Sequence, residues 1–62
     1  MSKRVTLGDA RLNIGAGVVY RPHPGAQAED GDITSVGEVY VFVRFAGDRA
    51  SKAVAPELLE WP

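Results

Sequence analysis

Glycine and proline interrupt this chain at short intervals, and this spacing limits the possible folds more than any other feature of the sequence. Seven glycines and four prolines are spread over 62 residues. Glycine weakens regular structure through its backbone entropy, and proline lacks the N–H that continues a hydrogen-bonded ladder. No stretch of helical length is left between these residues. The sequence therefore predicts an all-β fold in which short strands are joined by turns.

Most segments between these breaks contain β-branched and aromatic residues, which favour strands. The five expected strands are residues 18–22, 32–36, 39–45, 50–54 and 60–61. An acidic loop, 23–31, precedes the second strand and ends at Gly31. We expect Gly31 where a neighbouring strand approaches closely or where φ is positive. Pro56 suits the first turn of a short helical step before the last strand.

The chain is long enough for one small domain, near the lower size limit for folding without disulfides, metal or a partner. We expect residues 12–62 to form the folded unit and residues 1–11 to form an N-terminal arm that packs on it. Before residue 15, apolar residues alternate with other residues in two pairs, Val5 with Leu7 and Leu12 with Ile14. This alternation indicates that the N-terminal part lies along the edge of the sheet.

The third expected strand, VYVFVRF at residues 39–45, is apolar at six of its seven positions. Successive side chains of a strand point to opposite faces. One face carries Val39, Val41, Val43 and Phe45, and the other carries Tyr40, Phe42 and Arg44. Arginine is rarely buried without a partner, so the face of Arg44 is assigned to the outside.

The same alternation in the first strand directs Val18 and Tyr20 inward and Val19 and Arg21 outward. The core is expected to be completed by Ile33, Val54, Leu58 or Leu59, and Trp61.

The outward set is the candidate binding surface, and its members are Tyr40, Phe42, Arg44, Val19 and Arg21. Two exposed aromatic residues on one strand face form a patch that monomers tend to avoid unless it binds something. Arginine and aromatic residues are also enriched in protein interfaces. Alternatively, the N-terminal segment folds over this face through Val5 and Leu7 and buries it. The sequence leaves both interpretations open.

Residues suited to catalysis or metal binding are few. The chain has no cysteine and a single histidine, His23, which has no Ser or Cys nucleophile beside it in the sequence. Glu29, Asp30 and Asp32 lack the ligand spacing of an EF-hand loop and are expected to belong to a mobile acidic loop. We therefore expect no catalytic residues, no metal and no cofactor, and a protein that is not an enzyme.

The start of the chain does not resemble a signal peptide. The longest apolar run is far shorter than the roughly 20 residues of a membrane-spanning helix. The expected location is the cytoplasm, with no membrane partner.

The order of these segments resembles a known family. IGAGVVYRP, an acidic loop, GDITSV, YVFVRFAGD and VAPELLE follow each other as in small SH3-like barrels of the KOW and Tudor type. The likeness covers residues 12–61 and implies a five-stranded barrel with a short helical turn before the last strand. In overall style the chain is also similar to uncharacterised small proteins of bacteriophages and prophages. SH3-like barrels host many unrelated functions, so the resemblance implies a fold more than an activity.

Two functions fit these expectations. The first is an interaction module that forms homo-oligomers or docks on a larger protein through the outer face of residues 39–45. The alternative is a nucleic-acid-binding module in which Tyr40 and Phe42 stack on bases. The phosphates are then contacted by Arg21, Arg44, Lys3 and Arg4. Nucleic-acid binders usually carry a basic excess, whereas this chain has a net charge of −1. Any affinity for nucleic acid is therefore expected to be weak and salt-dependent.

Overall fold

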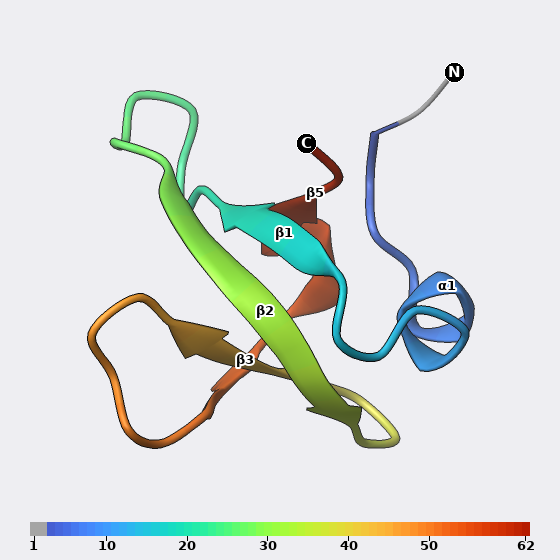
Figure 1. Cartoon of the computed structure of the whole chain (residues 1–62). Coiled ribbons are helices and arrows are strands. Elements are labelled where there is room, and N and C mark those ends of the chain that lie inside the picture. Colours follow the sequence, from blue (N-terminus) through green and yellow to red (C-terminus); the bar gives the residue numbers. More distant parts are fainter. Residues whose placement is uncertain (1–2) are drawn as a thin grey trace.

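The computed structural model describes residues 3–62 and contains one five-stranded antiparallel sheet (Figure 1). In chain order the elements are α1 (Leu7–Arg11), β1 (Gly17–Tyr20), β2 (Glu29–Val36), β3 (Val41–Phe45), β4 (Lys52–Val54), the 3₁₀ helix η1 (Pro56–Leu58) and β5 (Leu59–Glu60). The strand order is β4-β3-β2-β1-β5, so β5 returns along the free side of β1. The all-β prediction is confirmed, and so is the helical turn at Pro56. Within residues 3–62, β4 and β5 form the two edges of the sheet.

A short helix, α1, forms where the sequence predicted none. The Thr6 side chain accepts a hydrogen bond from the Asp9 backbone N–H at 3.1 Å, which caps the first turn. Ala10 is fully buried and joins the core. This cap and this burial offset the cost of Gly8 inside the helix. The prediction that no helix forms was wrong here, because Gly8 was taken to exclude a helix, whereas a helix of little more than one turn needs only a cap and one buried side chain.

The N-terminal segment is paired with the last strand. The Trp61 N–H donates to the Lys3 carbonyl at 2.7 Å, and the Val5 N–H donates to the Leu59 carbonyl at 3.4 Å. Val5 is buried in the core. Residues 3–11 of the expected arm therefore contribute to the core, while residues 1 and 2 lie outside the described residues.

The core lies on the face of the sheet that the alternation of residues 39–45 predicted. Val41 and Val43 are fully buried there together with Ile33 and Leu59. Val18 and Val54 complete the buried strand residues, and Tyr20, Phe45, Leu58 and Trp61 pack against this cluster. Apart from Val39, the predicted core members are thus confirmed, with Leu59 in the deeper position and Leu58 at the margin.

The strand boundaries differ from the predicted ones at the start of β2 and at the start of β3. β2 begins at Glu29, so part of the expected acidic loop is strand. β3 begins at Val41 and not at residue 39, because the Gly37 N–H donates to the Tyr40 carbonyl at 2.8 Å and closes a turn. Val39 therefore lies in a turn and is 63% exposed, so its predicted inward position was wrong.

Candidate functional site

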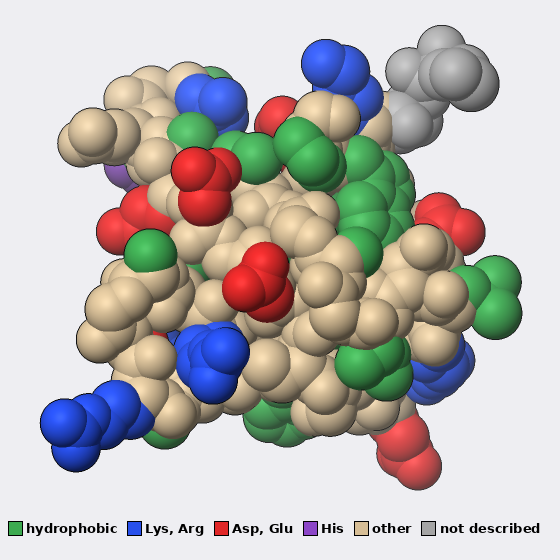
Figure 2. Space-filling model, viewed as in Figure 1, with side chains coloured by type: hydrophobic (Ala, Val, Ile, Leu, Met, Phe, Trp, Pro, Cys, Tyr) green, Lys and Arg blue, Asp and Glu red, His purple; other side chains and the backbone are tan. Residues whose placement is uncertain are grey.

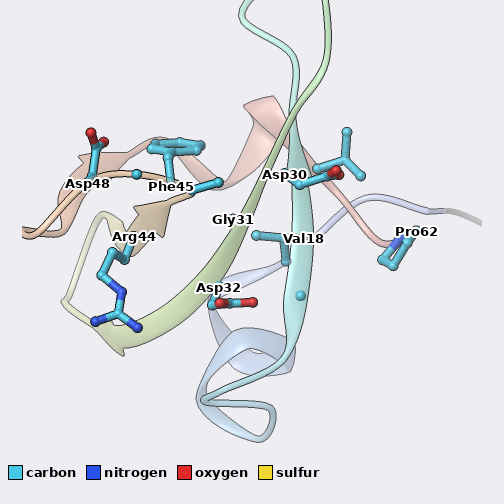
Figure 3. A pocket seen from close by; sticks show the side chains of 12 residues that line it. Val18, Asp30, Gly31, Asp32, Arg44, Phe45, Asp48 and Pro62 are labelled. Carbon is cyan, nitrogen blue, oxygen red and sulfur yellow. The ribbon is translucent and has the colours of Figure 1, made fainter.

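A hollow of about 430 Å³ lies across β1, β2 and β3, and outward residues of these strands line it together with Val18, Gly31 and Phe45 (Figure 3). Strand register builds it: Arg44 lies opposite Asp32, and Asp32 lies opposite Gly17. Two residues further along β1, Val19 lies opposite Asp30. Two members of the predicted surface, Val19 and Arg44, thus line one hollow although 24 positions separate them in the sequence.

A glycine leaves the room for this hollow. A Cβ atom at Gly17 would lie 3.9 Å from the Asp32 Oδ1 atom, with no closer heavy atom. Any larger side chain at position 17 would therefore project into the space in front of Asp32. The absence of a side chain at Gly17 therefore leaves the part of the hollow beside Asp32 open.

The charges that line the hollow are mixed. Carboxylates come from Asp30, Asp32 and Asp48, and the guanidinium comes from Arg44. Asp30 and Asp48 project on opposite sides of the hollow in Figure 3. No group of three His, Cys, Asp or Glu residues within residues 3–62 is arranged to hold a metal ion. The arrangement suits contact with polar groups of another molecule.

Tyr40 and Phe42 lie outside this hollow. Phe42 is half-buried in β3, where it pairs with Ser35 and Ala53 of the neighbouring strands. Its ring also lies close to the turn after β2, because a Cβ atom at Gly37 would be 3.3 Å from Phe42 Cε2. Tyr40 precedes β3 in that turn and is 49% exposed, so strand alternation does not determine its direction.

Arg21, the last member of the predicted set, belongs to a different part of the surface. Its Nε atom lies 3.9 Å from Glu60 Oε1, and its Nη1 atom donates to the Ala26 carbonyl at 3.4 Å. With His23 and Glu57 it lines a separate hollow of about 510 Å³. No serine, threonine or cysteine lines that hollow, so His23 has no nucleophile to activate there.

The N-terminal segment packs away from the outer face of β3. Val5 and Ala10 belong to the same core cluster as Val41 and Val43, which are inner-face residues. Helix α1 packs against β2. Of the two arrangements that the sequence left open, residues 3–11 adopt the one that leaves Arg44 exposed and Phe42 partly exposed.

Sequence reasoning missed the exposure of three apolar residues, Leu12, Ile14 and Val39. Leu12 is 85% exposed and Ile14 is 57% exposed, although both were expected to pack along the sheet edge. Together with Val39 and Tyr40 they are the exposed large hydrophobic residues of the part that the structure describes. The glycines at positions 15 and 37 were the available signal, because they place both pairs in turns.

Comparison with known proteins adds no functional assignment. None of the helices in residues 3–62 is long and apolar enough to cross a membrane. The chain has no significant match among protein-family models, curated proteins or solved structures.

Proposed function

We propose that this protein is a small SH3-like barrel that acts as a non-enzymatic interaction module in the cytoplasm. It docks on a larger protein or on a second copy through the outer face of β3 and the turn before it. The observation that carries this proposal is the packing of residues 3–11. They join the core and pair with β5 instead of covering Phe42 and Arg44.

The strand order supports the fold assignment. Four strands form an antiparallel meander, and the fifth returns beside the first after a 3₁₀ turn that begins at Pro56. Short strands and a small core characterise barrels of this size. The proposal adds closure of the sheet through the bend of the long β2 strand, where the register shifts between Ile33 and Ser35.

The chemistry of the surface supports binding more than catalysis. The hollow beside Arg44 is open and has a mixed lining, which contains no serine, threonine, cysteine or histidine. Exposed Tyr40 and Arg44 are residue types that frequently dominate the binding energy of interfaces. A surface that combines an aromatic residue and arginine with aspartates, and that lacks serine, cysteine and histidine in its hollow, suits a protein partner.

Nucleic-acid binding has weaker support. On the face that Figure 2 shows, lysine and arginine side chains are dispersed, with carboxylates between them. The hollow beside Arg44 contains three carboxylates, which would repel a phosphate backbone. The basic stripe that a nucleic-acid module needs is therefore not formed around Arg44.

The experiment measures the solution mass by sedimentation over a wide concentration range, together with titration by a single-stranded and a duplex oligonucleotide. Where two copies associate through this face, the mass increases with concentration and Phe42→Glu reduces this increase while the protein stays folded, because a charge in a desolvated contact is costly. Oligonucleotide binding should be weak and should disappear at high salt. Tight, salt-resistant oligonucleotide binding by a monomeric protein would contradict the proposal.

A further inference from the structure

Two turns at one end of the sheet lie side by side. The connection from α1 to β1 contains Leu12 and Ile14, and the connection from β2 to β3 contains Val39 and Tyr40. The Arg11 guanidinium joins them, since its Nη2 atom donates to the Gly37 carbonyl at 3.1 Å. Figure 1 shows both connections at the end where the β2 arrow terminates.

These two turns hold all the exposed large hydrophobic residues found in residues 3–62. Scattered single apolar residues are normal on a protein surface, but their restriction to one end marks an interaction site. We call this end the apolar end, and it consists of Leu12, Ile14, Val39 and Tyr40.

The charges around the apolar end favour a second copy of this chain as the occupant. Arg11, Asp9 and Glu38 are all exposed in or beside the two turns. In a two-fold interface the same surface meets itself, so it must carry both signs of charge. Arg11 of one copy can then face Glu38 or Asp9 of the other. A surface of one sign would repel itself.

The required area also limits the kind of dimer. A stable interface covers about 800 Å² of each partner, which is roughly a fifth of the 4286 Å² surface of this chain. Four partly exposed side chains are too few to supply that area, so the charged residues around them must be included. Such a mixed interface is expected to form at high concentration and to dissociate on dilution.

We propose that two copies of this chain associate through the apolar end. This inference builds on the proposed interaction function and assigns self-association to a surface separate from the hollow beside Arg44. The outer face around Arg44 then stays free for a larger partner protein.

The test measures the dissociation constant of the dimer by sedimentation for the wild type and matched variants. Leu12→Glu and Val39→Glu should each raise the dissociation constant at least about tenfold, because they bury a charge in the contact. Ala50→Glu makes the same charge change at an exposed site in the β3–β4 connection and should leave the constant unchanged. Melting temperatures should match the wild type for all three, since the replaced side chains are exposed.

Further outcomes separate this inference from the proposed function. A wild type that remains monomeric at all concentrations overturns the dimer. Association that survives Leu12→Glu and Val39→Glu but is lost in Arg44→Ala also overturns it, and it assigns the contact to the outer face, as the proposed function states. Association that survives Arg44→Ala and is lost in Leu12→Glu supports the apolar end.

Discussion

Gly31 offers the sharpest test of the sheet register. It lies in β2 between Val18 of β1 and Phe45 of β3. A Cβ atom at this position would lie 2.6 Å from Val43 Cγ1, 3.1 Å from the Arg44 carbonyl oxygen and 3.1 Å from Phe45 Cδ1. Ordinary carbon–carbon contacts are about 3.5–4.0 Å. Val43 is fully buried and cannot move aside without disturbing the core.

The cost of filling this position follows from that overlap. Overpacking a core typically costs about 1–3 kcal/mol, and here one backbone oxygen must move as well. We expect Gly31→Ala to lower the free energy of unfolding by about 2 kcal/mol and Gly31→Val by about 3 kcal/mol or more. For a chain of this size, a change of about 1 kcal/mol in the free energy of unfolding shifts the melting temperature by about 4–8 °C. The melting temperature of Gly31→Ala should therefore fall by about 10 °C.

The assay is thermal and urea unfolding followed by circular dichroism at low protein concentration. Gly8→Ala is the matched control, because nothing lies within 4 Å of its added Cβ atom and Gly8 is an exposed residue of α1. The free energy of unfolding of this control should rise by up to about 1 kcal/mol, since alanine favours the helical conformation more than glycine does. An unchanged melting temperature of Gly31→Ala would refute the close approach of β2 to β3 and the register derived from it.

The remaining expectations use the same unfolding assay, apart from the last. Val43→Glu should unfold the chain because Val43 is fully buried, whereas Phe42→Glu should leave it folded. If Val43→Glu stays folded and Phe42→Glu unfolds, the two faces of β3 have been assigned the wrong way round. Val5→Ala should cost about 2 kcal/mol by leaving a cavity, while Leu12→Ala should change little; equal effects would contradict the burial of Val5. Oligonucleotide binding, measured by fluorescence anisotropy, should be weak and should fall steeply with salt.

Local patterns were enough to predict the type and order of the strands. Alternation in residues 39–45 identified Val41 and Val43 as core residues, because a strand with one buried face repeats every two residues. Pro56 identified the 3₁₀ turn, since its fixed φ angle suits the start of a helical step. Gly31 was correctly associated with close strand approach, and its φ angle is not positive.

The candidate surface was harder to predict because it depends on contacts between distant residues. Val19 and Arg44 share a hollow only through the register of β1 with β2 and of β2 with β3. Arg21 has the same outward alternation as Val19, yet it interacts with Glu60 and lines a different hollow. Alternation gives the direction of a side chain and says nothing about its neighbours across the sheet.

The sequence by itself determined that this chain forms short strands joined by turns, with Val41 and Val43 on the core side, because breakers and alternation act within a few residues. Only the tertiary structure decided that Val5 enters the core and that Val39 does not. The first depends on pairing between residues 3–5 and β5, at opposite ends of the chain. The exposure of Val39 depends on the turn that the Gly37–Tyr40 hydrogen bond closes. Val39 lies in this turn, so the alternation of β3 applies only from Val41 onward.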